Sequence, residues 1–198
     1  EEEPFLGSTL VSIYAKFGLF TEAWDLLKEL PDQDVVTWTA LMTGYIDQGL
    51  PSEALECFEQ MQSEGFSPTA ATFVCTLKAC GNIGAAVKGR KLHGDIMRKG
   101  LEMNLIVGST LVDMYAKCGL LPIAQQVFDK LPIRDVVTWT ALMSGYAHIG
   151  ESLNVFHHFD RMLGEGVKPN PVTILVVLNA CSRSGMFTSS QTYFEVMS

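Results

Sequence analysis

The sequence predicts an all-α fold, a solenoid of stacked helical hairpins, and two observations lead to this prediction. The nine-residue string Asp-Val-Val-Thr-Trp-Thr-Ala-Leu-Met occurs at residues 34–42 and returns unchanged at 135–143. Apolar residues recur at helical spacing, and no stretch alternates with the period of two for long enough to indicate a strand. A single hairpin cannot bury its own apolar face, so neighbouring hairpins must stack.

The displacement of 101 residues between the two strings aligns the two halves of the chain. The aligned segments share short strings such as Gly-Ser-Thr-Leu-Val and Tyr-Ala-Lys, and they have 31 or 35 residues apart from a shortened last one. We expect three unit types, each present twice: 4–34 and 105–135, 35–69 and 136–170, and 70–104 and 171–198.

Residues 35–69 show how one unit is expected to fold. Its first helix carries an apolar stripe at positions i, i+3, i+4 and i+7, made of Trp38, Leu41, Met42 and Tyr45. Gly49 is a natural stop for this helix, and Pro51 can begin a second one. The stripe of the second helix consists of Ala54, Phe58 and Met61. Gly65 and Pro68 end it, so the unit is a helical hairpin.

Composition limits the classes of function. Apolar runs are far shorter than the ~18 residues that span a membrane, so no membrane partner is expected. The five cysteines are odd in number and form no C-x-x-C pair, which argues against a disulfide framework and a zinc site. The net charge of -8 is unfavourable for nucleic-acid binding. The first residues, Glu-Glu-Glu-Pro, show no signal or transit peptide.

A second stripe is expected beside the apolar one on the first helices. It pairs an apolar residue with a small polar residue three positions later, as in Val36 with Thr39 and Val137 with Thr140. The apolar side chain could contact a base face while the hydroxyl bonds to the base edge. Solvated neighbours of the core stripe would produce the same pattern, so the stripe alone leaves both interpretations open.

Several strings resemble the pentatricopeptide repeat family. They are Val-Val-Thr-Trp-Thr-Ala-Leu-Met-Thr-Gly-Tyr at 35–45, Leu-Lys-Ala-Cys at 77–80, Gly-Arg-Lys-Leu-His at 89–93, Leu-Val-Asp-Met-Tyr-Ala-Lys-Cys-Gly at 111–119 and Gly-Val-Lys-Pro-Asn at 166–170. The 31-residue unit resembles the PLS subclass, and a tetratricopeptide array with 34 residues per repeat would not explain it. The resemblance implies a right-handed α-solenoid with S-type repeats at 4–34 and 105–135, P-type repeats at 35–69 and 136–170, and L-type repeats at 70–104 and 171–198.

In that family, each base is read by the fifth and the last residue of a repeat. The resemblance therefore implies five base-reading pairs: Ser8 with Asp34, Thr39 with Thr69, Val74 with Asn104, Ser109 with Asp135, and Thr140 with Asn170. The residues beside the base faces would be Phe5, Val36, Ala71, Ile106, Val137 and Val172. The shortened last unit supplies Leu175 without a partner. Candidates for phosphate contacts are Lys16, Lys78 and Lys117.

The chemistry of these pairs predicts a target sequence. An ionised Asp only accepts hydrogen bonds, which suits guanine N1–H and N2–H2, whereas an Asn amide donates and accepts, which suits adenine. The family preference runs the same way, so we expect 5′-G-R-N-G-A, with R a purine and N any base. Thr69 departs from the usual Asn or Asp, and Val74 lacks a polar group, so the second and third positions are the least defined.

Positive charge is concentrated in one stretch despite the acidic total. Six of the 14 Lys and Arg residues lie there beside a single acid, Asp95: Lys78, Lys88, Arg90, Lys91, Arg98 and Lys99. A local positive potential can coexist with a negative net charge. We still expect weak RNA binding with steep salt dependence.

No enzyme activity, cofactor or metal is expected. His157 and His158 are adjacent, so on a helix they point about 100° apart, and surface positions are expected for both. His93 is expected to be a partly buried packing residue, and Cys80 and Cys181 small core residues. PLS proteins often end in a cytidine-deaminase-like domain, but its His-x-Glu and C-x-x-C strings do not occur here. A glycine-rich phosphate loop is also absent from the sequence.

These observations support two expectations about function. The first is sequence-specific binding of single-stranded organellar RNA, as the specificity module of a C-to-U editing factor in the chloroplast or mitochondrion. The second is a protein-interaction scaffold that binds accessory editing factors through its L-type repeats, where Val74 and Leu175 are apolar. Self-association through the end of the shortened solenoid is a further expectation.

Overall fold

The computed structural model describes residues 3–30 and 33–184, with side chains from Gly7 onward, and every regular element of that part is an α-helix. The chain divides into two compact units, and the boundary lies between Leu101 and Glu102. The first unit contains α1 (Glu3–Lys16), α2 (Phe20–Glu29), α3 (Val35–Asp47), α4 (Pro51–Ser63), α5 (Ala70–Ile83) and α6 (Ala86–Arg98). The second contains α7 (Leu105–Lys117), α8 (Leu121–Lys130), α9 (Val136–His148), α10 (Ser152–Gly164) and α11 (Pro171–Ser184). The predicted all-α class is confirmed.

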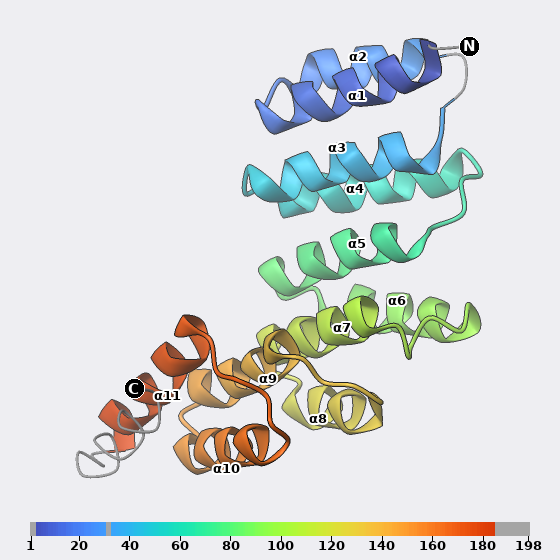
Figure 1. Ribbon diagram of the computed structural model, residues 1–198. Helices are drawn as coiled ribbons and strands as arrows, with labels where there is room; N and C mark the ends of the chain where they lie inside the picture. Colours follow the sequence, from blue (N-terminus) through green and yellow to red (C-terminus); the bar gives the residue numbers. More distant parts are fainter. Residues whose placement is uncertain (1–2, 31–32, 185–198) are drawn as a thin grey trace. The chain divides into compact units, whose positions relative to one another are not determined.

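Consecutive helices pair into hairpins in both units, and the first helices of the hairpins pack on one another (Figure 1). In the first unit, α3 lies between α1 and α5, and in the second unit α9 lies between α7 and α11. The second helices α4 and α10 also contact the next first helix. Each unit therefore has a layer of adjacent first helices, and this layer carries the candidate site.

The predicted apolar stripes are buried. Trp38, Leu41 and Met42 on α3 are at most 1% exposed. The stripe of α4 is buried as well and consists of Ala54, Phe58 and Met61. The hairpin turn between these helices uses Gly49, whose φ of 74° is strained for other residues, and Leu50 N–H donates to the Tyr45 carbonyl to close it. Cys80 and Cys181 are buried, as predicted.

A glycine lets the first helices approach closely in each unit. A Cβ atom on Gly44 of α3 would lie 2.5 Å from Ala15 Cβ and 2.9 Å from the Ala15 carbonyl carbon. A Cβ atom on Gly145 of α9 would lie 2.8 Å from Ala116 Cβ. Since real contacts of this kind are essentially never below 3.0 Å, these glycines set the spacing of the layer.

Candidate nucleic-acid interface

The last residue of each predicted repeat caps the first helix of the next one. Asp34 Oδ1 accepts hydrogen bonds from Thr37 N at 2.7 Å and Thr37 Oγ1 at 2.6 Å. Asp135 Oδ1 accepts from Thr138 N at 2.9 Å and Thr138 Oγ1 at 2.7 Å. In both cases the structure shows no partner for Oδ2 among the residues that it describes. The cap therefore uses one carboxylate oxygen and leaves the other as an acceptor.

The two asparagines cap in the same way and leave a donor instead. Asn104 Oδ1 accepts from Ile106 N and Val107 N, both at 3.1 Å. Asn170 Oδ1 accepts from Thr173 N at 2.8 Å. Because the carbonyl oxygen is engaged, the Nδ2 amide is the group that each asparagine can offer to a ligand. Capping thus gives Asp and Asn opposite hydrogen-bonding characters.

A third threonine, Thr72, joins the predicted pair Thr39 and Thr69. Thr39 Oγ1 donates to the Val35 carbonyl at 2.7 Å and lies 3.0 Å from Thr72 Oγ1 on α5. Thr69 Oγ1 also lies 3.0 Å from Thr72 Oγ1, and Thr69 and Thr72 form a capping box. Thr72 is therefore the bridge between the two predicted base-reading residues.

Thr173 bridges the predicted pair Thr140 and Asn170 in the second unit. Its hydroxyl lies 2.7 Å from Thr140 Oγ1 and donates to Asn170 Oδ1 at 2.9 Å. Thr140 Oγ1 also donates to the Val136 carbonyl at 2.7 Å. Two hydroxyl hydrogens thus serve three contacts, so one contact lacks a hydrogen in any single arrangement. Thr173 is fully buried and Thr140 is 7% exposed, so of the two threonines only Thr140 has any surface that a ligand could contact.

The residues of the other predicted pairs lie in varied surroundings. Ser109 is 7% exposed and donates to the Ile106 carbonyl at 3.0 Å, and in the described part of the chain it forms no hydrogen bond with Asp135. Ser8 is half-buried on α1, and Val74 is half-buried on α5. The roles of these residues stay predictions.

The residues predicted to lie beside the base faces are exposed where their side chains are described. Val36 is 69% exposed, Ile106 65%, and Val137 and Val172 56% each. Ala71 is exposed as well, and the side chain of Phe5 lies outside the described residues. The second residue of these predicted repeats is therefore a solvent-exposed apolar residue, three positions before the fifth residue.

A depression of about 320 Å³ gathers many of these groups in the first unit. It is lined by Ser12, Lys16, Val36, Thr39, Ala40, Thr43, Gly44, Thr69 and Ala71. A depression of about 310 Å³ occupies a related place in the second unit and is lined by Asp113, Ala116, Lys117, Ala141, Ser144, Gly145 and His148. Five residues of the first depression have their equivalents in the second after the 101-residue displacement: Ser12, Lys16, Ala40, Thr43 and Gly44.

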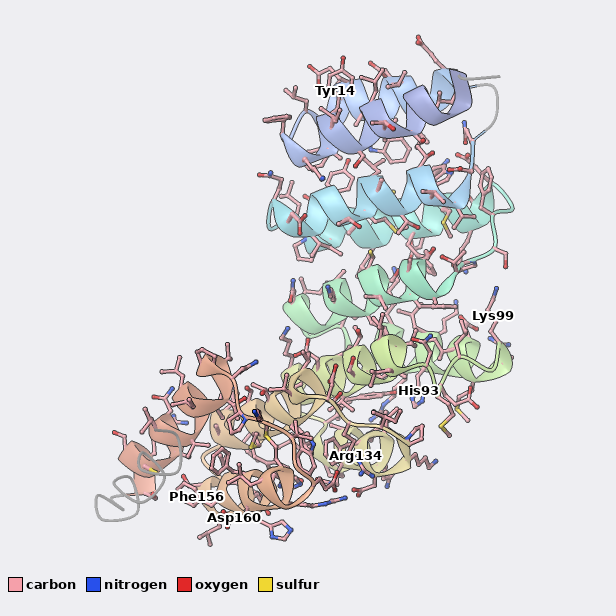
Figure 2. All side chains as sticks on the ribbon, viewed as in Figure 1. Tyr14, His93, Lys99, Arg134, Phe156 and Asp160 are labelled. Atoms are coloured by element: carbon pink, nitrogen blue, oxygen red, sulfur yellow. The ribbon has the colours of Figure 1, made fainter. Side chains whose placement is uncertain are left out.

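The lysines predicted to contact phosphates differ in whether their ammonium groups are already paired. Lys16 and Lys78 are exposed, whereas Lys117 Nζ forms an ion pair with Asp113 Oδ2 at 2.7 Å. The basic stretch lies mainly on the second helix α6 and its end, where Lys99 extends to Ser67 Oγ at 2.7 Å (Figure 2). Lys88 pairs with Glu59 at 2.6 Å, which lowers the pKa of Glu59 through this hydrogen bond and charge. The stretch therefore contributes to contacts between hairpins, and only its Lys78 lies on a first helix.

The surface position expected for His158 is wrong. His157 is exposed, but His158 is only 5% exposed, stacks on Tyr146 and contacts Gln125 Oε1 at 2.9 Å through Nε2. The two rings lie edge to face, with centroids 5.5 Å apart and planes at 90°, and the His158 ring packs against Phe128 of α8 and Trp139 of α9. Burial is the largest cause that lowers the pKa of His158.

Sequence reasoning missed the bridging threonines and the place of His148. A signal for the threonines was present, because Thr72 and Thr173 follow their capping residues by three positions, the spacing of a capping box. His148 lines the second depression, and the sequence alone does not reveal which residues line it. No group of three or more metal-ligating side chains occurs in the described ranges. No helix there is long and apolar enough to cross a membrane.

Comparisons with protein families and relatives agree with the hairpin architecture. The PPR repeat family model matches residues 33–82 and 134–183, and the PPR repeat model matches 8–35 and 109–136. The putative pentatricopeptide repeat-containing protein At2g01510 of Arabidopsis thaliana is 40% identical over 98% of this chain. The protein CRR2, chloroplastic, of the same plant is 39% identical over 98% of it. The chain spans only 23% and 30% of the length of these relatives.

Solved structures share the fold. The maize pentatricopeptide repeat protein PPR10 aligns over the whole chain and 34% of its own length, with a TM-score of 0.55 and 21% identity. The same protein in complex with an 18-nt psaJ RNA element aligns with a TM-score of 0.52 and 20% identity over 35% of its length. The proteinaceous RNase P 2 of A. thaliana has a TM-score of 0.63 with 12% identity, over 89% of this chain and 41% of its own. Together with the family models, which match more than half of the chain, the repeats and hairpins establish that this chain belongs to the pentatricopeptide repeat family.

Proposed function

We propose that the chain binds single-stranded RNA along its first helices, with one base per repeat. The depression at Thr39 and Thr69 is the observation that carries this proposal. It combines the hydrogen-bonding pair, the apolar residues Val36 and Ala71 predicted to flank the base, and the cation Lys16. Stacking surfaces, an edge-reading polar group and a nearby cation are the three components of single-strand recognition.

The capping geometry supports the predicted base preferences. Asp34 and Asp135 each keep a carboxylate oxygen that can accept from guanine N1–H and N2–H2. Asn170 keeps its amide, which can donate to adenine N1. Thr69 has a hydroxyl that donates or accepts, so its repeat discriminates little between purines. The proposed target remains 5′-G-R-N-G-A.

One relative and one solved structure support a wider role. One relative carries the designation chloroplastic, and PPR10 has been solved with RNA. The mixture of 31- and 35-residue repeats supports an assignment to the PLS subclass, with the repeat ranges given above. We accordingly propose that the chain is the specificity module of an organellar C-to-U editing factor, and that catalysis belongs to another domain or protein.

Titration with labelled RNA tests the proposal. One oligonucleotide contains G-A-U-G-A, and the second is a scramble of the same composition. At about 50 mM salt, where the electrostatic contribution is strong, we expect the first to bind several-fold more tightly. Equal weak binding of the two would refute base reading.

A protein-interaction scaffold is the second candidate. Leu175 is 60% exposed and occupies the fifth position of its repeat on α11, where a base-reading residue would need a polar group. An exposed leucine suits an apolar partner surface better than a base edge. Absence of binding to either oligonucleotide would favour this function for the chain.

A further inference from the structure

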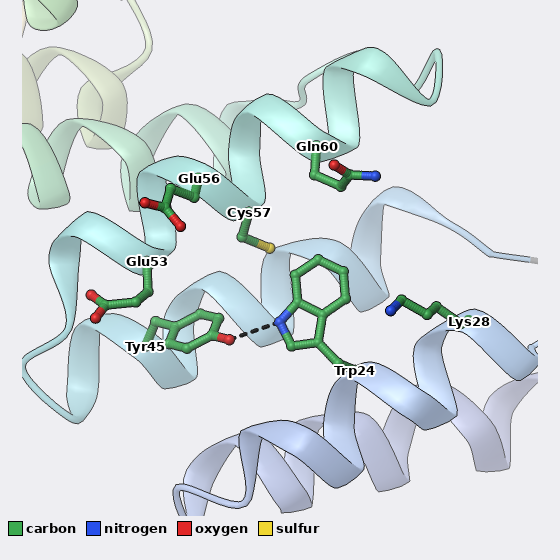
Figure 3. Close-up of a pocket in the computed structure, with 7 residues that line it drawn as sticks. All are labelled: Trp24, Lys28, Tyr45, Glu53, Glu56, Cys57 and Gln60. Atoms are coloured by element: carbon green, nitrogen blue, oxygen red, sulfur yellow. Dashed lines mark hydrogen bonds between the residues drawn. The ribbon is translucent and has the colours of Figure 1, made fainter.

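A depression of about 480 Å³ lies away from the proposed RNA site, between α2, α3 and α4 (Figure 3). Its lining combines two aromatic side chains with carboxylates and consists of Trp24, Lys28, Tyr45, Glu53, Glu56, Cys57 and Gln60. The proposed function does not use any of these residues.

The polar groups of this depression are mainly hydrogen-bond acceptors. Trp24 Nε1 donates to the Tyr45 hydroxyl oxygen at 2.7 Å, which leaves that oxygen a second lone pair (Figure 3). Gln60 donates its amide to Glu64 at 2.7 Å, so the Gln60 carbonyl can accept. Glu53 and Glu56 form no ion pair within the described part of the chain. These acceptors outnumber the one cation in the lining, Lys28, and favour a ligand rich in hydrogen-bond donors.

The aromatic wall already attracts a cation. Lys28 Nζ lies 5.7 Å from the centroid of the Trp24 ring, within the range of a cation–π interaction. Lys28 is exposed and sits on the α2 side, whereas Glu53 and Glu56 come from α4. The three charges sum to a net negative value at the opening.

The second unit shows which group fits such a place. After the 101-residue displacement, Cys57 corresponds to His158, Trp24 to Gln125 and Tyr45 to Tyr146. The His158 ring stacks on Tyr146 with centroids 5.2 Å apart and an angle of 26°. Its Nε2 lies 2.9 Å from Gln125 Oε1, and its Nδ1 lies 2.7 Å from the Asn154 carbonyl. A planar aromatic group thus fills this place in the second unit, and its single N–H in the neutral form can donate to the Asn154 carbonyl or to Gln125 Oε1.

The first unit lacks that ring and carries more negative charge. Cys57 is far smaller than histidine, and Glu53 and Glu56 stand where the second unit has Asn154 and His157. We infer that this depression binds a guanidinium group, that of an arginine side chain or of a small arginine-like molecule. A guanidinium is planar, permanently charged and offers five N–H donors to carboxylates and an aromatic face, which a compact ammonium cannot match. This inference does not depend on the proposed RNA binding.

Nuclear magnetic resonance of the Trp24 indole N–H tests the inference directly. The probes are N-acetyl-arginine amide, N-acetyl-lysine amide and the neutral isostere N-acetyl-citrulline amide. We expect a saturable shift with the arginine probe in the millimolar range, several-fold weaker binding of lysine, and no saturation with citrulline. Equal binding of citrulline, or no saturation with arginine, would overturn the inference.

Two variants assign the effect to this depression. Cys57→His should fill it, as the second unit does with His158, and should abolish the shift. The double variant Glu53→Gln, Glu56→Gln should fold normally and should weaken arginine binding about tenfold. If Cys57→His does not fold, the double variant still tests whether arginine binds in this depression. His158→Cys is the matched control in the second unit and should leave the Trp24 response unchanged. Unaltered arginine binding in the double glutamine variant would refute the site.

The source of the guanidinium is distinguished by two further ligands. Agmatine represents a free metabolite, and the blocked peptide Gly-Gly-Arg-Gly-Gly represents a protein segment. Tighter binding of the peptide assigns the depression to a protein partner, and tighter binding of agmatine assigns it to a small molecule. Failure of both to bind would overturn the inference.

Discussion

The hydroxyl oxygens of Thr140 and Thr173 lie 2.7 Å apart, and this contact joins two successive first helices of the second unit. Thr173 also holds the capping carbonyl of Asn170. The fifth residue of one repeat and its last residue are therefore coupled through a threonine of the next repeat. If RNA binds as proposed, a base that bonds to one of them will act on the hydrogen-bond arrangement of both.

Thr173→Val tests this coupling. Valine keeps the branched shape but removes the bridging hydroxyl, so the discrimination between adenine and guanine at the fifth base should fall about threefold or more. Loss of the capping partner should also lower the free energy of unfolding by about 1 kcal/mol. Binding to G-A-U-G-A and G-A-U-G-G measures the first effect. Thr138→Val removes the same bond to the capping residue Asp135 and should leave the fifth base unaffected; an unchanged preference in Thr173→Val would disprove the coupling.

Asn170→Asp should move the preference at the fifth base from adenine toward guanine. The cap should survive, because Asp135 caps α9 with the same geometry that Asn170 uses on α11. The change then exchanges a free amide donor for a free carboxylate acceptor. We expect the ratio of dissociation constants for the two oligonucleotides to shift about fivefold, which corresponds to a hydrogen bond of about 1 kcal/mol. An unaltered ratio would show that Thr140 and Asn170 do not read this base.

Gly44→Ala should destabilise the first unit. The added Cβ would meet backbone atoms of Ala15 at 2.9 Å, so α1 and α3 must move apart at a cost of about 1–3 kcal/mol. Gly94→Ala on α6 is the matched control, because nothing lies within 4 Å of its added Cβ. Alanine is the better helix former, so the control should be stabilised by about 0.5–1 kcal/mol. Denaturant unfolding of both variants measures the difference, and similar values would argue against close packing at Gly44.

The free energy of unfolding should depend on pH through His158. Its pKa lies below the ordinary histidine value of 6.5, mainly because the ring is buried. The charges of His157 and Arg161 lower the pKa further, whereas the bond to the Asn154 carbonyl and the charge of Asp129 raise it. Between the lowered pKa and 6.5 the unfolded chain binds more protons than the folded protein, so stability falls as the pH falls through this window.

Unfolding at pH 5 and pH 7.5 checks this expectation. His158→Gln should flatten the profile across the window, whereas His157→Gln, at an exposed position, should leave the profile nearly unchanged. If the two variants behave alike, the titration of His158 does not control stability.

The fold was predictable because local signals and burial agree. Trp38 and Met61 belong to stripes of helical period, and Gly49 and Pro51 mark the turn between them, so each level of evidence led to the same hairpin. The duplication added a second copy in which the same pattern could be checked. Contacts between repeats were harder to predict, because spacing within a helix does not reveal what the neighbouring helix presents.

Three examples show which contacts the sequence could and could not predict. His158 and His157 are adjacent in the sequence, and only the tertiary packing against Gln125, Phe128 and Tyr146 makes His158 the buried one. The capping role of Thr173 follows from local spacing, but its contact with Thr140 depends on how two first helices pack. The ion pair of Lys117 with Asp113 follows an ordinary i, i+4 spacing and could have been anticipated from the sequence.

Asp113→Asn should strengthen RNA binding without a change in base preference. Asp113 pairs with Lys117 in the second depression, whereas the first unit has Ser12 and Lys16 at the equivalent positions, and Lys16 forms no ion pair in the described ranges. Removal of the carboxylate frees the ammonium for a phosphate and removes a repulsive charge. The affinity should rise about threefold to tenfold at low salt, equally for the target and the scramble, and the gain should shrink at higher salt.

Glu59→Gln is the control of equal charge. Glu59 lies on the second helix α4 and pairs with Lys88, so its removal changes the net charge of the protein by the same amount away from the first helices. We expect this variant to alter RNA affinity by less than about twofold, because charges beyond a Debye length of about 10 Å are largely screened. Equal gains in the two variants would mean that net charge, rather than the position of Lys117, governs the interaction with phosphates.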